Sequence, residues 1–194
     1  MKHELQRTLA TFLALALLTI PIAATSFPDV PDNAVYADAA EYLNEAGIMQ
    51  GDAQGNFNPD KSVTRAQMAA ILCRMLDETE DLATDGSQFT DVPASYWANG
   101  YILKAADLGI IGGYKDGTFK PDNTVTFEQA VTMVVRAVGG ETIAQESGGY
   151  PSGFLSIAKT YGFLSGVKVA SGTEMSRANV AIVLYNSNGF YFDT

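Results

Sequence analysis

Two arginines stand where a helix start would normally avoid a cation. Arg65 follows Thr64 and Arg177 follows Ser176, and both preceding residues are typical helix N-caps. The positive end of the helix dipole disfavours a cation at this position and favours an anion beside it. Free backbone N–H groups together with a planar guanidinium can bind a carboxylate or a phosphate. The competing interpretation is an arginine that is solvated or paired with a neighbouring acidic residue.

The residues after these positions predict the helix that presents each arginine. A hydroxyl residue followed three positions later by Gln forms a capping box, in which each side chain satisfies the other's backbone N–H. The pairs are Thr64 with Gln67, Thr126 with Gln129 and, in a weaker form, Ser176 with Asn179. An apolar stripe at helical spacing follows each pair. Its members are Met68, Ile71, Leu72, Met75 and Leu76, then Ala130, Met133, Val134, Ala137 and Val138, then Val180, Val183 and Leu184.

These helices belong to three copies of one unit. The segment 27–31 recurs at 89–93, and the same offset of 62 residues relates later motifs of the first two copies. The third copy is shorter and lacks the Asp-Gly-x-Phe-x-Pro loop that the second copy has at 116–121. An earlier amphipathic helix in each copy is predicted to end at a glycine. Units of this size bury too little surface alone, so we expect them to share one core.

The N-terminus predicts export. Lys2 and Arg7 precede an apolar run over 9–20, and small residues follow it, which is the order found in a secretory signal peptide. The run is shorter than the roughly 20 residues that span a bilayer. We therefore expect cleavage near Ala24 and no stable membrane span afterwards, the alternative being an uncleaved signal anchor. The remaining 10 basic and 21 acidic residues give a formal charge of −11, which argues against nonspecific nucleic-acid or anionic-membrane binding.

Residue types argue against an enzyme. The one histidine, His3, lies in the predicted signal peptide, so the one cysteine, Cys73, has no histidine base and is interpreted as a small buried hydrophobe. Nothing selects a carboxylate pair for glycoside hydrolysis. The segment 52–56 lacks the ligand pattern of a calcium loop and is expected to form a tight turn. The sequence predicts a non-catalytic protein with no metal and no cofactor.

Five short motifs occur in order: Phe-x-Asp-Val-Pro, an aromatic residue before the first helix, Gly-Ile-[Ile/Met]-x-Gly, Asp-Gly-x-Phe-x-Pro and Val-Thr-Arg-Ala-Gln. Together they resemble S-layer homology repeats, clearly in the first two copies and partially in the third. The resemblance implies an all-α fold of three tandem helix-loop-helix repeats, packed as a pseudo-threefold spindle around a central helical bundle. The predicted divisions are the signal peptide 1–24, copy one 25–86, copy two 87–146 and a degenerate copy three 147–194.

The resemblance also implies a function. Such repeats anchor proteins noncovalently to the cell surface by binding secondary cell-wall polysaccharide, often through pyruvate-ketal sugars, in grooves between repeats. The family's groove arginine corresponds to Arg65 and Arg177. Copy two has Phe127 and Glu128 after its cap, so we expect its groove to bind poorly. The other expected ligand-binding residues are Gln67, the glycines Gly51 and Gly113, and the aromatic residues Trp97 and Tyr114. These glycines and aromatics have a second interpretation, as turn glycines and core aromatics.

The expected location is the wall or surface layer, and the expected partner is an anionic, pyruvylated polysaccharide or peptidoglycan. One alternative is a surface-assembly or protein-interaction module with other surface proteins as partners, because the sequence shows no cargo domain after the repeats. Another is a peptidoglycan tether without polysaccharide recognition. If Arg65 faces solvent, its replacement by alanine should change stability by less than about 1 kcal/mol.

Overall fold

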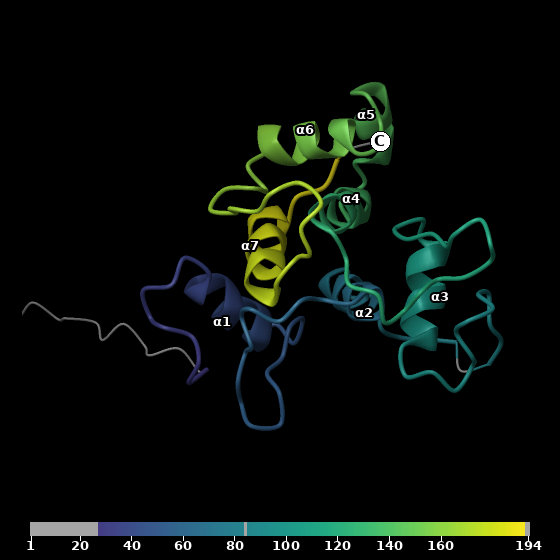
Figure 1. Cartoon of the computed structure of the whole chain (residues 1–194), viewed down its shortest axis with the longest axis horizontal. Coiled ribbons are helices and arrows are strands. Elements are labelled where there is room, and N and C mark those ends of the chain that lie inside the picture. The colour runs from purple at the N-terminus through teal and green to yellow at the C-terminus, as the bar shows by residue number, and fades with distance from the viewer. Residues whose placement is uncertain (1–26, 84, 193–194) are drawn as a thin grey trace, which may run out of the picture.

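The computed structural model describes residues 27–83 and 85–192 (Figure 1), so the predicted signal peptide lies outside the described residues. Within these ranges the protein is all-α, with three isolated β-bridges in place of any longer strand. No described helix has the length and apolar character needed to cross a membrane. The helices are α1 (Ala37–Glu45), α2 (Arg65–Met75), α3 (Asn99–Asp107), α4 (Phe127–Ala137), α5 (Glu141–Glu146), α6 (Ser152–Thr160) and α7 (Arg177–Ser187).

The predicted caps begin the three longest helices. The Thr64 hydroxyl accepts a hydrogen bond from the Gln67 N–H at 3.2 Å, and the Gln67 side chain accepts one from the Thr64 N–H at 3.0 Å. The same reciprocal pair starts α4. In α7 the Ser176 hydroxyl accepts from the Asn179 N–H at 3.3 Å, without the reciprocal bond. The capping predictions are confirmed, including the weaker third one.

The first helix of each copy ends as predicted, at a glycine with positive φ: Gly47 (+71°), Gly109 (+71°) and Gly162 (+79°). The short helix α5 was not predicted, because six residues without a side-chain cap carry too little periodic signal. It follows α4 directly and packs against α6.

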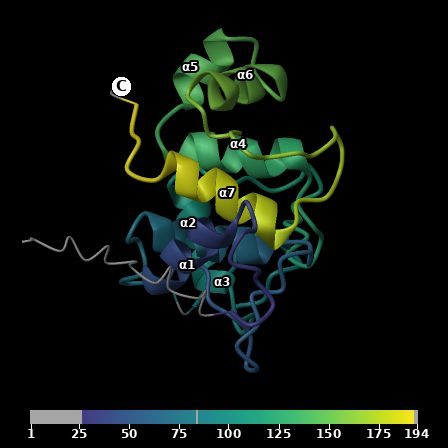
Figure 2. The same cartoon turned by 90° about the vertical axis from the view of Figure 1, so that its left-hand side faces the viewer.

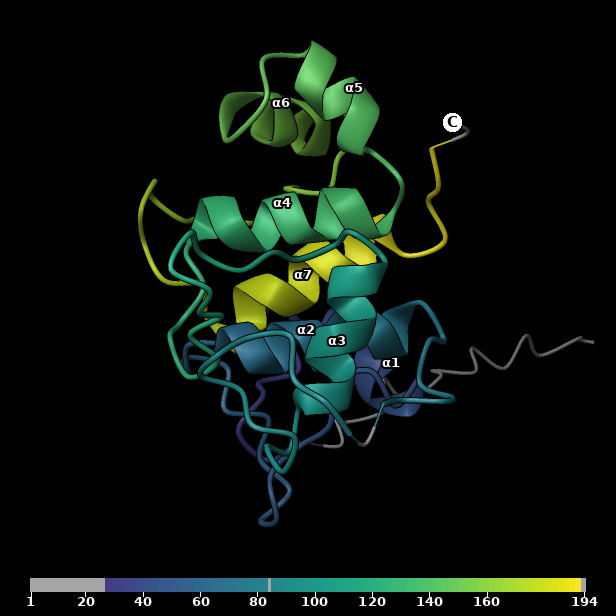
Figure 3. The same ribbon diagram turned by 90° about the vertical axis from the view of Figure 1, so that its right-hand side faces the viewer.

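Helices pack across copies. The first helix of copy two, α3, packs on α2 of copy one, and α6 of copy three packs on α4 of copy two. The first helix of copy one, α1, packs on α7, which closes the series into a circle. The helices α2, α4 and α7 lie toward the middle with α1, α3 and α6 around them (Figure 1), and α4 contacts both α2 and α7. Helices α5 and α6 cover the side of α4 that faces away from α7 (Figures 2 and 3).

Three backbone hydrogen bonds join the copies just before α2, α4 and α7. The Val63 N–H donates to the Met175 carbonyl, the Met175 N–H to the Val125 carbonyl, and the Val125 N–H to the Val63 carbonyl, each at 2.9 Å. All three side chains are fully buried. This ring brings the starts of the three capped helices together and fixes where each N-terminal arginine points.

Candidate functional site

The Arg65 side chain extends from copy one into the loop of copy two. Its Nε donates to the Phe119 carbonyl at 2.7 Å and its Nη2 to the Gly112 carbonyl at 2.8 Å. The guanidinium carbon lies 4.4 Å from the centre of the Phe119 ring and 5.1 Å from that of Tyr114. Arg65 is only 5% exposed. The expectation that it faces solvent is therefore wrong, because the loop of the next copy folds over it.

Arg177 makes the equivalent contacts one step around the ring. Its Nε donates to the Phe57 carbonyl at 2.6 Å and its Nη2 to the Gln50 carbonyl at 2.8 Å, both in copy one. Its guanidinium lies over the Phe57 ring at 4.8 Å. Burial lowers the pKa of Arg65 and of Arg177, as it does for any cation removed from water. Two copies thus present an arginine to a neighbouring loop in the same way, buried at Arg65 and partly buried at Arg177.

The helix N-terminus itself does not offer free N–H groups at these positions. The Arg65 N–H donates to the Asn123 carbonyl at 2.8 Å, and the Ala66 N–H to the Pro121 carbonyl at 3.0 Å. In α7 the Arg177 N–H donates to the Lys61 carbonyl at 2.9 Å. The prediction that open backbone donors form part of an anion site is wrong, because carbonyls of neighbouring copies accept from these N–H groups. An anion would have to be met by the side chain.

Each arginine stands at the edge of a cleft. The Arg65 cleft has a volume of 340 Å³ and is lined by the loop 110–113, by Tyr150 and by one face of α4: Gln129, Thr132, Met133 and Arg136. The Arg177 cleft has a volume of 160 Å³ and is lined mainly by the loop 50–52, Asn58, Lys61 and Gln67. In both, the arginine of one copy faces the loop and the capping glutamine of the next. Gln67 therefore lines the Arg177 cleft and not the Arg65 cleft.

The third junction is built differently. Phe127 takes the position of the arginine, and the next residue, Glu128, reaches into copy three. Its carboxylate accepts from the Ser171 hydroxyl at 2.5 Å and from the Gly172 N–H at 2.9 Å. The hydrogen bond from Ser171 holds the pKa of Glu128 below its usual value. At this junction the anionic group is a side chain of the protein itself, the Glu128 carboxylate.

Gly51 and Gly113 lie in the Arg177 and Arg65 clefts respectively. A Cβ added to Gly51 would lie 2.8 Å from the Phe27 ring, and one added to Gly113 would lie 2.4 Å from the Phe89 ring. Neither glycine has a positive φ. The absence of a side chain is thus explained by the opening phenylalanine of each copy, which packs against the loop backbone.

The two aromatic residues predicted to contact a ligand, Trp97 and Tyr114, are not among the residues that line the two clefts. Trp97 is 57% exposed and lines a separate hollow of 240 Å³ beside Leu82 and Gly100. Tyr114 lies against Arg65, and the Lys120 ammonium stands 4.3 Å from the centre of its ring. The structure brings Tyr114 close to Arg65 and places Trp97 elsewhere.

Four residues with polar side-chain groups line the Arg65 cleft but were not among the predicted ligand-binding residues: Gln129, Thr132, Arg136 and Tyr150. Tyr150 is 56% exposed. It precedes Gly162 by 12 residues, as Trp97 precedes Gly109, so the repeat register alone marks it as the matching aromatic position.

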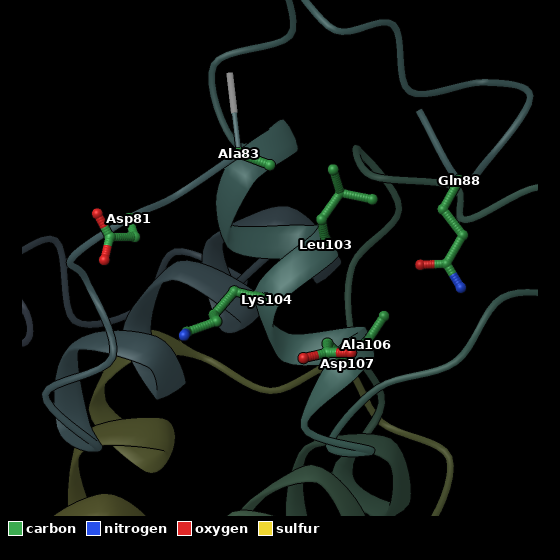
Figure 4. Close-up of a pocket in the computed structure, with 7 residues that line it drawn as sticks. All are labelled: Asp81, Ala83, Gln88, Leu103, Lys104, Ala106 and Asp107. Carbon is green, nitrogen blue, oxygen red and sulfur yellow. The ribbon is translucent and has the colours of Figure 1, made fainter. Parts of the chain in front are cut away.

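A cavity of 590 Å³ lies between α3 and the segment that joins copies one and two. Figure 4 shows Asp81 and Gln88 on opposite sides of α3, with Lys104 and Asp107 between them. The Lys104 ammonium is paired with Glu78 at 2.9 Å. These side chains do not converge on one point, and none belongs to the repeated motifs, so the two arginine clefts are the better candidates.

Comparison with known proteins identifies the family. A family model described as the S-layer homology domain matches residues 26–69 and 88–131. A cell surface protein of Thermoanaerobacter kivui is 35% identical over 187 residues, which is 93% of this chain. The chain belongs to the S-layer homology domain family. The third S-layer homology repeat stays a prediction, since the matched residues lie in copies one and two.

Other relatives match this chain over part of their length. A surface layer protein of Brevibacillus choshinensis is 31% identical over 170 residues, or 86% of this chain. A cellulosome-anchoring protein of Acetivibrio thermocellus is 31% identical over 119 residues, or 60% of this chain. The matched regions make up 24%, 15% and 26% of the lengths of these three relatives, so the chain spans about a quarter or less of each.

Proposed function

We propose that this chain is a non-catalytic anchoring module at the cell surface that binds an anionic secondary cell-wall polysaccharide in the Arg65 and Arg177 clefts. One observation carries the proposal: Arg65 is buried and Arg177 partly buried, and neither forms an ion pair with a described residue. Among the described residues the ion pairs are Lys104 with Glu78 and Arg136 with Glu141. The carboxylates that act on these groups, Asp91 on Arg65 and Asp29 and Asp52 on Arg177, form no ion pair with them. Removing a cation from water is costly, and a ligand carboxylate would offset part of that cost.

The geometry of each guanidinium suits a carboxylate ligand. In Arg65 and in Arg177, Nε and Nη2 are held by backbone carbonyls, while Nη1 bonds no acceptor in the described part of the chain. The side chain is therefore fixed before the ligand arrives, which lowers the entropic cost of binding. A pyruvate-ketal sugar, which carries a carboxylate on its ring, matches this donor, whereas a neutral glycan does not.

We further propose that the three units form a pseudo-threefold spindle in which only two junctions bind. The ring of three backbone hydrogen bonds and the circular packing of α1 on α7 support this arrangement. The third junction has Phe127 in place of the arginine and Asn179 in place of the glutamine. Its loop glycine, Gly166, is approached by Val35, which takes the place that Tyr150 has in the Arg65 cleft. Two clefts on one chain would raise avidity for a repeating polymer.

Sedimentation with purified wall sacculi tests the proposal. The full chain is mixed with intact sacculi, with sacculi stripped of polysaccharide, and with sacculi from which the pyruvate ketals have been removed. We expect co-sedimentation only with the first. Equal binding to all three would refute polysaccharide recognition, and equal binding to the first and third would refute the role of the carboxylate.

Variants assign the binding to the clefts. Lys61→Glu changes the Arg177 cleft and Tyr150→Ala the Arg65 cleft, and neither residue is buried. Each should weaken co-sedimentation, and the double variant should abolish it. The matched control is Tyr191→Ala, since Tyr191 is 64% exposed and lies in neither cleft. Loss of binding in the control would show that the effect is not specific to the clefts.

A surface-assembly role is the second candidate. It is favoured by exposed apolar side chains away from the clefts, including Val35 at 71% and Trp97 at 57%. Assembly predicts self-association without any wall polymer, and light scattering on the purified chain measures it. A monomer at all concentrations would exclude this role.

A further inference from the structure

Two tyrosine side chains meet where α1 and α7 pack together. Tyr42 lies on α1 and Tyr185 on α7, 185 minus 42 or 143 positions apart in the sequence. The centres of their phenol rings are 5.5 Å apart, and the ring planes meet at 72° in a T-shaped contact. Tyr42 is 38% exposed and Tyr185 is 43% exposed. No other two tyrosine rings are in such contact in the part of the chain that the structure describes.

This contact lies where the circle of helices closes, between α1 and α7 (Figures 1 and 2). The polypeptide runs from copy one into copy two and from copy two into copy three, so the backbone links those pairs of copies. Copy three meets copy one through noncovalent contacts alone. Counted from the start of the long helix and from the glycine that ends the first helix, the equivalent pairs are Cys73 with Lys104 between α2 and α3, and Val135 with Ile157 between α4 and α6. Of the three equivalent pairs, the tyrosine pair is the one at the contact that the backbone does not link.

A hydrogen bond holds the Tyr42 ring against α7. The side-chain amide of Asn188, the residue that follows α7, donates to the Tyr42 hydroxyl at 2.6 Å. Asn188 and Tyr185 are three residues apart and lie on the same side of the helix end. When a phenol loses an electron, the ring carbons next to its hydroxyl become reactive. The hydrogen bond therefore holds the reactive end of the Tyr42 ring at the end of α7 that carries Tyr185.

We propose that Tyr42 and Tyr185 form an oxidative cross-linking site, at which hydrogen peroxide and a haem peroxidase join α1 to α7 covalently. Each phenol gives one electron and its hydroxyl proton to the oxidant, which leaves two phenoxyl radicals. The radicals couple through the carbon next to each oxygen and form one carbon–carbon bond. The hydrogen atoms on these two carbons then move to the oxygens, which restores both phenols. The protein loses two hydrogen atoms in all, and one molecule of peroxide is reduced to two molecules of water.

The new bond makes the closure of the circle permanent. A cross-link between distant residues stabilises the folded state because it restricts the unfolded chain, and the effect grows with the length of the loop. For a loop of more than about 100 residues in a protein of this size, the melting temperature should rise by about 10 °C. The reaction does not involve the wall polymer, so this proposal stands or falls independently of the proposed function.

Oxidation of the purified full chain with a haem peroxidase and hydrogen peroxide tests the proposal. The fluorescence of coupled phenols and an intact monomer mass lower by two hydrogen atoms measure the product. Cleavage after glutamate releases Tyr42 in segment 42–45 and Tyr185 in segment 175–194, so a peptide that joins these segments locates the bond. We expect an equal yield after about tenfold dilution, because the two rings are already held together. Free tyrosine, oxidised in parallel, shows that the oxidant is active.

Phenylalanine variants assign the bond to the pair. Tyr42→Phe and Tyr185→Phe each keep an aromatic ring but remove the hydroxyl from which the radical forms. Each should abolish the joined peptide and the rise in melting temperature. The matched control is Tyr191→Phe, because Tyr191 is 64% exposed and is released in the same segment as Tyr185. The control should give the joined peptide in the yield of the wild-type chain.

Several results would overturn the proposal. One is the absence of the joined peptide from the wild-type chain under conditions that couple free tyrosine. Another is a joined peptide that persists in Tyr42→Phe or disappears in Tyr191→Phe. A yield that falls with dilution would mean that the bond joins two molecules. A joined monomer that melts no higher than the untreated chain would show that the bond does not form in the native contact.

Discussion

Replacing Arg65 by alanine tests whether its guanidinium holds copies one and two together. In the folded protein, the guanidinium donates to the carbonyls of Phe119 and Gly112 at 2.7 and 2.8 Å, and its face lies over the Phe119 ring. Alanine would leave both carbonyls without this donor and open a void beside a fully buried ring. We therefore expect Arg65→Ala to destabilise the protein.

The magnitude follows from these contacts. Hydrogen bonds from a charged donor contribute about 1.5 to 3 kcal/mol each, so two of them contribute about 3 to 6 kcal/mol. Alanine also removes a cation whose desolvation opposes folding, which offsets part of the loss. We expect the free energy of unfolding to fall by about 3 kcal/mol, a large fraction of the roughly 5 to 15 kcal/mol typical of a folded domain.

Urea unfolding of the full chain, followed by far-ultraviolet ellipticity, measures this loss. The matched control is Arg74→Ala in the same helix, because Arg74 contacts the Tyr101 ring at 5.3 Å and no carbonyl bond holds its side chain in the described structure. The control should lose less than about 1 kcal/mol. If Arg65→Ala loses no more than the control, the guanidinium does not hold the two copies together and the reasoning is refuted.

Three further predictions concern packing, pH and thiol chemistry. Gly113→Ala should cost about 1 to 3 kcal/mol because the new Cβ would lie 2.4 Å from the Phe89 ring, whereas Gly112→Ala, with nothing within 4 Å, should barely move the urea midpoint. The lowered pKa of Glu128 predicts stability that is complete at neutral pH and is lost as pH falls through its ordinary value of 4.5 and below; Glu128→Gln should flatten this part of the profile of urea midpoint against pH. Burial raises the pKa of the Cys73 thiol to about 11, so iodoacetamide should modify it at mildly alkaline pH only after denaturation.

Each has a clear contrary result. Equal losses of stability in the two glycine variants would show that contact with the Phe89 ring does not explain why residue 113 is a glycine. An unchanged pH profile in the glutamine variant would mean that another carboxylate controls acid unfolding. Rapid labelling of the native thiol would contradict its burial.

Features that are satisfied within a few residues were predictable from the sequence. The caps at Thr64 and Thr126 bond to residues three positions away, and Gly47 and Gly109 adopt the positive φ that ends a helix. Each depends on local geometry that the residue type determines. The helices and their repetition therefore followed directly from the pattern.

Features that depend on another copy were not predictable. Arg65 bonds to a carbonyl 47 residues away, and Arg177 to one 127 residues away. The repeat pattern states that the copies are alike but not which copy faces which, so it could not reveal that Arg177 meets Gln67. For the same reason the helix N–H groups were predicted to be free, although carbonyls of neighbouring copies accept from them. Arg65 was likewise predicted to face solvent, although it is buried.

The circular packing has a consequence for how the molecule folds. In an open stack of repeats, each unit depends only on its neighbours, and units can be added or removed at the ends. Here α1 needs α7, and Val63, Val125 and Met175 each donate to one partner and accept from the other. Deleting any copy would remove contacts from both others, so we expect the three copies to unfold together in a single transition. A fourth copy could therefore not join this ring without breaking one of its contacts.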